Sequence, residues 1–140
     1  MKKITLIALC LVLLVACEPD AIDDPTADIT VDFVGTWNRD SVLVYEIETN
    51  GARTLVSEES NVGRYKFNAD KTGVLSVVAG DYAINWSYNA SGKTMLISEV
   101  DWVGQVYNVQ ANSETVVRLV GKRNIGGGLQ EERILRLSKQ

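Results

Sequence analysis

Acidic side chains are the residues of this chain whose type and spacing come nearest to catalytic chemistry. The sequence contains no histidine, which excludes Ser-His-Asp triads, Cys-His pairs and HExxH zinc helices. Two acidic pairs are sequence neighbours, Glu58-Glu59 and Glu131-Glu132. Neighbours on a strand point to opposite faces, so neither pair can flank one glycosidic bond. We therefore predict that the protein is not an enzyme.

A third acidic pair lies beside an aromatic residue. Glu99 and Asp101 are two positions apart, so on a strand they would lie on the same face, and Trp102 follows them. Such a group could bind a sugar in a carboxylate-dependent hydrolase of envelope glycans. A hairpin end with solvated charges explains the same residues, and this is the interpretation we favour.

The segment from Asn68 to Gly73 has part of the spacing of a calcium loop. Asn68, Asp70 and Thr72 stand where an EF-hand places its first ligands, but Ala79 replaces the closing bidentate glutamate. We predict instead a β-turn in which Asn and Asp side chains bond the backbone and Gly73 takes a positive φ. No metal site and no cofactor are expected.

Three consecutive glycines, Gly126–Gly128, follow Lys122 and Arg123. A phosphate cradle would require a helix N-terminus after the glycines, and no helical pattern follows. We expect a flexible, basic, solvated connection here.

The N-terminal segment is typical of an export signal. Lys2 and Lys3 precede the uncharged stretch 4–16, which is shorter than the roughly 20 apolar residues of a membrane span. Leu14-Val15-Ala16-Cys17 resembles the bacterial lipobox, in which the signal is cut before a lipidated cysteine. The resemblance implies a signal peptide over 1–16 and a lipid on Cys17. A cleaved secretory signal with an incidental cysteine is the alternative.

The cysteine count follows from that processing. Cys10 lies within the signal and would leave with it, so the mature chain would keep Cys17 alone. No disulfide is then available despite an extracytoplasmic location.

The charge of the chain is concentrated in one segment. The formal net charge is −4 and the pI is about 4.8, which argues against nucleic-acid binding. The excess acid precedes Phe33, and this composition predicts a disordered tether over 17–32. Acidic residues directly after Cys17 resemble the surface-export signal of Bacteroidetes lipoproteins. Display on the cell surface and attachment at the periplasmic face of the outer membrane both stay open.

Residues 33–140 have the pattern of an all-β domain. Turn signals such as Asn50-Gly51 separate short runs of Val, Ile, Leu, Thr, Tyr and Trp, as in a sandwich or barrel. No proline follows Pro25 to remove a ladder donor. Short connections favour an up-and-down antiparallel order. The pattern predicts eight strands at about 36–48, 53–59, 63–68, 73–79, 82–88, 94–100, 104–110 and 115–121, and allows a ninth over 131–138.

Two motifs carry a family resemblance over residues 33–140. Gly35-Thr36-Trp37 at the start of the first strand resembles the lipocalin signature, and the hairpin 65–73 resembles that of small lipocalin-like domains on Bacteroidetes lipoproteins. The resemblance implies a small barrel of about eight strands whose floor is closed by Trp37. It also implies an arginine stacked on Trp37, for which Arg118, Arg133 and Arg136 are the candidates.

The size of such a barrel leaves two functions open. An eight-stranded barrel either is filled by side chains or holds one small ligand. By alternation Trp37 shares a face with Leu43 and Tyr45, and the inward residues are expected to be large. We expect the protein to bind a small apolar or amphiphilic ligand. The alternative is a filled barrel that acts as an envelope accessory or protein-interaction module. The expected ligand contacts inside the barrel are Tyr65, Phe67, Trp86 and Tyr88.

Overall fold

The computed structural model describes residues 29–99 and 102–140, and this part of the chain consists of strands and their connections. The strands are β1 (Gly35–Ile47), β2 (Arg53–Ser60), β3 (Arg64–Phe67), β4 (Thr72–Val77), β5 (Gly80–Asn89), β6 (Thr94–Glu99), β7 (Trp102–Ser113), β8 (Val116–Gly126) and β9 (Leu129–Lys139). They form one sheet in the order β2-β1-β3-β4-β5-β6-β7-β8-β9, and every pairing is antiparallel. No helix long and apolar enough to span a membrane occurs in this described part.

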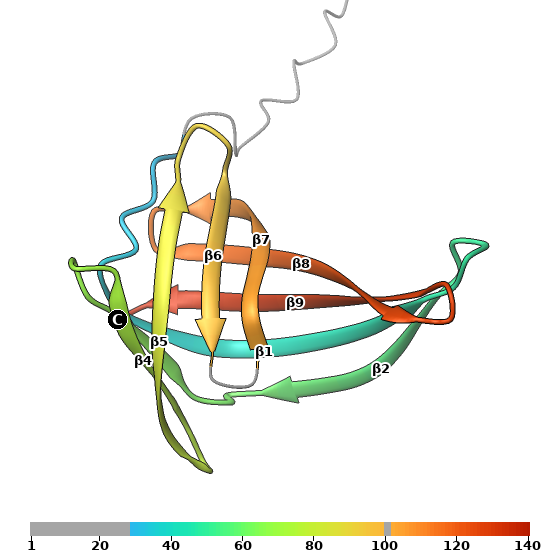
Figure 1. The fold of residues 1–140 in the computed structure, drawn as a ribbon. Coiled ribbons are helices and arrows are strands. Elements are labelled where there is room, and N and C mark those ends of the chain that lie inside the picture. Colours follow the sequence, from blue (N-terminus) through green and yellow to red (C-terminus); the bar gives the residue numbers. More distant parts are fainter. Residues whose placement is uncertain (1–28, 100–101) are drawn as a thin grey trace, which may run out of the picture.

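Pairing of β1 with β9 closes the sheet into a barrel (Figure 1). The sheet has nine strands, and β2 lies outside the ring because it pairs only with β1. The predicted all-β, up-and-down antiparallel barrel of eight strands is therefore confirmed. The strand over 53–59 was expected in the ring, and the ninth strand takes its place.

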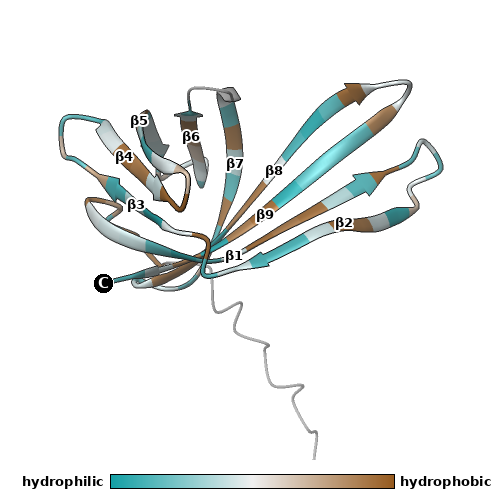
Figure 2. Ribbon diagram, turned by 90° about the horizontal axis from the view of Figure 1, so that it is seen from below, coloured by the Kyte–Doolittle hydropathy of each residue, from teal (hydrophilic) through white to brown (hydrophobic). Residues whose placement is uncertain are grey.

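Beyond the barrel, β1, β8 and β9 continue and β2 joins them in a projecting sheet, which we call the arm. Figure 2 shows the β1–β2 and β8–β9 hairpins reaching away from the other strands. The arm comprises residues 41–47, 53–60, 121–126 and 129–135, joined by ladders between β2 and β1, β1 and β9, and β9 and β8. The expectation of a flexible connection at Lys122 and Arg123 is wrong, because both residues lie within β8. Gly127 and Gly128 form the turn between β8 and β9.

A bulge in β1 reverses the face on which its side chains lie. The β1–β9 register shifts between Arg39 and Ser41, so one extra residue is inserted there. Trp37 and Val42 are consequently both buried in the core. The parity that grouped Trp37 with Leu43 and Tyr45 is therefore wrong, because simple alternation does not cross a bulge.

The core begins before the first strand. Val31 and Phe33 are buried in it, and Asp32 accepts a hydrogen bond at its backbone oxygen from Lys139 Nζ at 2.7 Å. The last residues of the segment expected as a tether thus contact the domain. The buried hydrophobic side chains are Val31, Phe33, Trp37, Val42, Tyr65, Phe67, Leu75, Ile84, Trp86, Met95, Ile97, Tyr107, Val109, Ala111, Val117, Leu119, Ile134, Leu135 and Leu137.

A sharp backbone break separates β2 from β3 along the same edge of β1. Asn61 and Gly63 both have positive φ, 53° and 121°. A Cβ on Gly63 would lie 2.1 Å from the backbone oxygen of Ser76. The break therefore depends on glycine, and it lets β3 turn toward β4 while β2 continues into the arm.

The segment from Asn68 to Gly73 forms the expected turn. Asp70 Oδ1 accepts hydrogen bonds from the backbone N–H and the hydroxyl of Thr72, at 3.0 and 2.6 Å. The positive φ of 70° belongs to Lys71 rather than to Gly73. Gly73 serves close packing instead, because a Cβ there would lie 2.4 Å from the backbone oxygen of Lys66.

Candidate functional site

The four side chains expected inside the barrel belong to an aromatic cluster. Tyr65, Phe67 and Trp86 are buried and Tyr88 is half-buried. The Phe67 ring lies 5.3 Å from that of Tyr65 and 5.1 Å from that of Trp86, and Phe33 contacts Tyr88 at 4.8 Å. Aromatic rings therefore fill the part of the barrel interior next to Phe33.

Trp37 lies in this cluster as the signature implies, but the cation beside it is a lysine. The indole is fully buried and its Nε1 donates to the Phe33 carbonyl at 2.9 Å. Lys139 Nζ lies 5.6 Å from the centre of the ring. Arg118 and Arg136 face each other across β8 and β9 on the outer wall, where Arg118 donates to Gln110 at 3.0 Å.

Next to the aromatic cluster, on the far side of the Tyr65 ring, the interior becomes polar. We call the residues that meet there the polar cluster: Arg39, Tyr65, Glu99, Tyr107 and Arg133. The Tyr65 hydroxyl donates to Glu99 Oε1 at 2.6 Å, and the Arg39 guanidinium carbon lies 5.4 Å from the Tyr65 ring centre. Arg133 lies close enough to Tyr107 for its positive charge to lower the pKa of the phenol. The cluster lies where β1 and β9 leave the barrel for the arm, since Arg39 borders the bulge and Arg133 pairs with Val44.

Burial shapes the ionisation of both tyrosines. It raises the pKa of Tyr65 well above its usual value, which Arg39 opposes and Glu99 reinforces. Burial likewise raises the pKa of Tyr107 to about 12, against the charge of Arg133. Both phenols therefore remain neutral hydrogen-bond donors at physiological pH.

The raised pKa of Tyr107 predicts that the folded protein loses stability at alkaline pH. The unfolded tyrosine ionises near pH 10 and the folded one near pH 12, so the favourable contribution is complete below about pH 10 and declines as the pH rises through about 12. Unfolding in urea across that window should show a loss of roughly 2–3 kcal/mol from this group. Tyr107→Phe should flatten that part of the profile, whereas Tyr82→Phe, at a half-buried position, should not. An identical decline in Tyr107→Phe would contradict the assignment.

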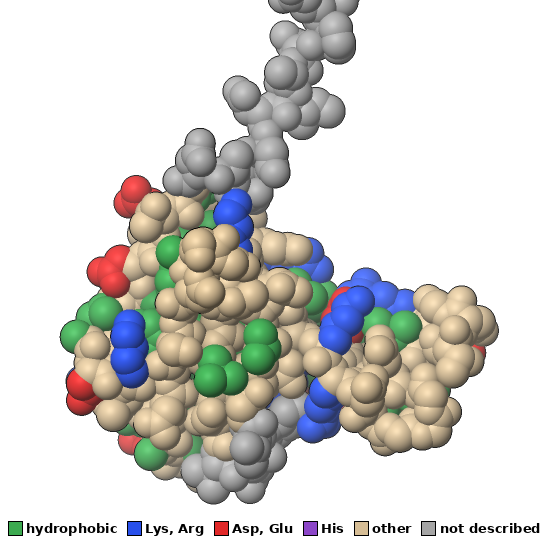
Figure 3. All heavy atoms as spheres, turned by 45° about the horizontal axis from the view of Figure 1, so that its top comes forward, with side chains coloured by type: hydrophobic (Ala, Val, Ile, Leu, Met, Phe, Trp, Pro, Cys, Tyr) green, Lys and Arg blue, Asp and Glu red, His purple; other side chains and the backbone are tan. Residues whose placement is uncertain are grey.

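Ion pairs line both faces of the arm, beside residues 45–47 of β1. On one face Glu131 Oε2 accepts from Arg123 Nη2 at 2.8 Å. On the other, Glu132 is bound by Arg53, and Lys122 Nζ lies 3.4 Å from its second oxygen. Figure 3 shows Lys and Arg side chains gathered in this region. The two glutamates thus have separate partners, as expected for strand neighbours on opposite faces.

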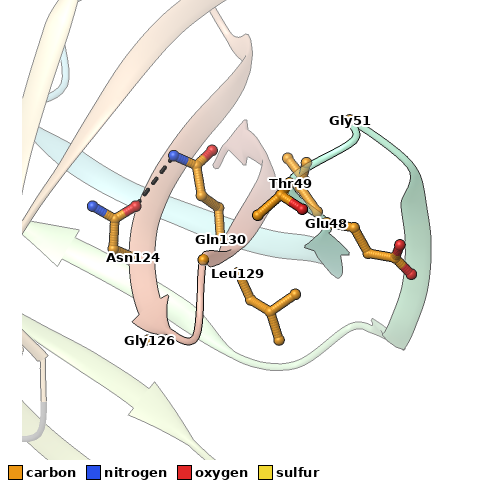
Figure 4. Close-up of a pocket in the computed structure, with 9 residues that line it drawn as sticks. Glu48, Thr49, Gly51, Asn124, Gly126, Leu129 and Gln130 are labelled. Atoms are coloured by element: carbon orange, nitrogen blue, oxygen red, sulfur yellow. Dashed lines mark hydrogen bonds between the residues drawn. The ribbon is translucent and has the colours of Figure 1, made fainter.

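The arm ends in an open hollow of about 620 Å³ between the tips of its two hairpins. Figure 4 shows Thr49 on one side of it and Leu129 and Gln130 on the other, with the Glu48 carboxylate directed away from them. Gln130 Nε2 donates to Asn124 Oδ1 at 3.1 Å, and Glu48 accepts from Asn50 at 3.1 Å. The hollow is open to solvent and Gln130, Asn124 and Glu48 already have hydrogen-bond partners, so the buried polar cluster is the stronger candidate site.

The remaining sequence candidates are placed as follows. Glu99 points into the barrel toward Tyr65, whereas Asp101 and the side chain of Trp102 lie outside the described residues, as do Cys10 and Cys17. Among the described side chains no group of three or more His, Cys, Asp or Glu could hold a metal ion.

Comparison with known proteins leaves the chain without an established relative. No family model matches the sequence, and no curated protein or solved structure is significantly similar to it. The site therefore has to be interpreted from its own geometry.

Sequence reasoning missed Arg39, and it gave Tyr65, Glu99 and Arg133 separate roles without placing them in one cluster. A usable signal was present, because Arg39 follows Trp37 by two positions and Glu99 follows Ile97 by two positions. Charged residues that share the parity of core residues are expected to face the interior. The meeting of β1, β6 and β7 at one level, however, depends on register and could not be derived from periodicity.

Proposed function

We propose that the barrel binds one small amphiphilic ligand, with its apolar part toward the aromatic end and its polar group at the polar cluster. The observation that carries this proposal is the change of the interior from aromatic rings to Arg39, Tyr65 and Glu99 along one barrel. Ligand sites commonly combine an apolar lining with a few polar groups that fix orientation. The resemblance of Gly35-x-Trp37 to the lipocalin signature supports the same role.

A binding role also suits the chemistry of the cluster better than catalysis does. Glu99 accepts a hydrogen bond from a phenol whose pKa is raised, and Tyr107 is likewise held neutral. Phenols with raised pKa values orient a ligand through hydrogen bonds without being poised to transfer protons near neutral pH.

The proposal can be tested with a photoreactive, alkyne-tagged fatty alcohol of about 12 carbons. Labelling of the full protein in native membranes should be saturable and should map by peptide mass spectrometry to inward positions next to the polar cluster. Replacing Ile97 with Trp adds bulk among buried side chains and should reduce labelling severalfold. The matched change Leu96→Trp, on the opposite parity of β6 where exposure is 37%, should not. Labelling confined to outer-wall residues would contradict ligand binding and favour the filled barrel that acts through partner proteins.

We further propose that the protein is a lipid-anchored lipoprotein of a bacterial cell envelope, attached to the outer membrane through Cys17. The lipobox-like residues 14–17 and the acidic residues that follow support this location. One acyl chain anchors only marginally, so several chains on one cysteine are needed for permanent attachment.

Lipidation predicts a simple labelling result. Cells fed an alkyne-tagged palmitate should incorporate it into the wild-type protein and into Cys10→Ser, and incorporation should fall to background in Cys17→Ser. The two variants differ only in which cysteine is lost, so labelling that persists in Cys17→Ser would refute the anchor. Protease accessibility on intact cells would then distinguish surface display from the periplasmic face.

A further inference from the structure

Four cations lie on the outside of the barrel, on β3, β9 and β8, with β1 between the first two of these strands. Each alternates with buried core residues of its strand, so its side chain faces outward. No carboxylate oxygen of residues 29–99 or 102–140 lies within 4.0 Å of any of the four. We call this surface the basic wall, and its cations are Arg64, Lys66, Arg118 and Arg136.

Two of these cations oppose each other directly. Arg118 and Arg136 are partners in the β8–β9 ladder, and like charges at such a position repel each other. Arg118 Nη1 donates to Gln110 Oε1 at 3.0 Å, but the amide is neutral and does not compensate the charge. An anion placed between the two guanidinium groups would relieve their repulsion.

An acidic residue also lies on this surface. Asp40 borders Ser41, which pairs with Arg136, and Asp40 Oδ1 accepts a hydrogen bond from Ser138 Oγ at 2.9 Å. When that carboxylate is counted, the four cations keep an excess of 4 − 1 = 3 positive charges among the described groups. The basic wall is therefore suited to an anionic partner.

The chain enters the domain beside the basic wall. Lys139 Nζ donates to the Asp32 backbone oxygen at 2.7 Å, and the Lys139 backbone N–H donates to the Thr115 oxygen at 2.8 Å. The first described residues thus lie where β9 ends and β8 begins (Figure 1). Arg118 follows Thr115 by three positions, which is about 10 Å along a strand.

The segment directly before that point carries the opposite charge. Its 11 residues, 18–28, contain no Lys or Arg. They span up to about 36–40 Å when extended, whereas four adjacent strands span roughly 15 Å. The segment is therefore long enough to reach every cation of the basic wall. Its acidic residues are Glu18, Asp20, Asp23, Asp24 and Asp28.

We propose that the basic wall binds the acidic segment 18–28 of the same chain. Single surface ion pairs are weak and are screened by salt, but a tethered segment has an effective concentration on the order of millimolar. Because the segment follows Cys17 directly, the contact fixes which side of the barrel faces the proposed anchor. The contact lies outside the barrel and is independent of ligand binding inside it.

The test places the photoreactive residue p-benzoylphenylalanine at position 116 of the full protein in native membranes. Val116 is 39% exposed and pairs with Ser138 at the edge of the basic wall. Irradiation should form a crosslink within one chain, which peptide mass spectrometry should map to residues 18–28. The yield should fall severalfold between about 0.01 and 1 M salt, because the screening length decreases from about 30 to 3 Å. The same probe at Val56, which is 63% exposed on the arm, should not crosslink to that segment.

A charge swap tests whether the pairing is direct. Arg118→Glu combined with Arg136→Glu should lower the yield severalfold. Addition of Asp23→Lys, Asp24→Lys and Asp28→Lys should restore it, because the signs on both partners are then reversed. A merely structural effect of the two wall substitutions would not be rescued by changes in the segment.

Lys71→Glu combined with Lys93→Glu is the matched control, since both lysines lie in exposed turns outside the basic wall. This reversal should leave the yield unchanged. Crosslinks from position 116 to a lipid, to another protein or to a second copy of this chain would overturn the proposal and identify a different occupant. A yield that does not respond to salt would overturn it as well. Where the doubly reversed wall fails to fold, the crosslink in the otherwise wild-type chain and its salt dependence decide the question.

Discussion

Replacing Trp37 with alanine should lower the free energy of unfolding by about 3–5 kcal/mol. The indole is fully buried, its ring centre lies 5.4 Å from that of Phe33, and its Nε1 donates to the Phe33 carbonyl at 2.9 Å. Truncation would leave a cavity at the floor of the barrel and an unbonded carbonyl beside it. Urea unfolding followed by circular dichroism measures the change without depending on tryptophan fluorescence.

Two further variants make the Trp37 result interpretable. Val106→Ala, at a position that is 54% exposed on β7, should change stability by no more than about 0.5 kcal/mol. Trp37→Phe keeps most of the ring and should cost less, chiefly through the lost hydrogen bond to Phe33. A loss below about 1 kcal/mol for Trp37→Ala would mean that the floor of the barrel is not held as described.

Gly63→Ala should be the most damaging single-methyl change, at roughly 3 kcal/mol or more. The φ of 121° is unfavourable for any residue with a Cβ, and that Cβ would lie 2.1 Å from the backbone oxygen of Ser76. Because the obstacle is backbone, relief requires β3 and β4 to move apart. Thermal unfolding of the variant, or its loss from the soluble folded fraction on expression, measures the effect.

Gly51→Ala is the matched control for Gly63. Its φ is also positive, 84°, but nothing lies within 4 Å of a Cβ there. The substitution should therefore cost only the conformational term of about 1–2 kcal/mol. Equal effects of the two substitutions would show that the close approach to Ser76 is not what makes glycine necessary.

The sequence predicted the architecture well because local signals determine it. Short β-rich runs separated by turn residues indicate antiparallel neighbours, and Phe67 and Trp86, which were expected inside the barrel, are buried. The bulge at Arg39 and the break at Gly63 were not foreseen. Each depends on contacts between strands, because a bulge is defined only against its partner strand.

The candidate site was less predictable than the fold. The inward rings were identified, but their packing against Phe33 was not, because Phe33 precedes the first strand and follows no alternation. The cation over Trp37 was sought among arginines, whereas Lys139 reaches it from the last strand. Both contacts join residues far apart in the chain, and a periodic pattern carries no information about them.

The antiparallel pairing of β1 with β9, which closes the barrel, has a consequence for how the chain folds. It joins the two ends of the domain, since Trp37 pairs with Lys139. Contacts of such long sequence separation favour slow folding. During synthesis the last strand to emerge is the one that completes the ring, and until then β1 and β8 present unpaired edges. A chain that stalls before β9 would therefore be an open sheet prone to aggregation, and a chaperone that delays folding until the end of synthesis would protect it.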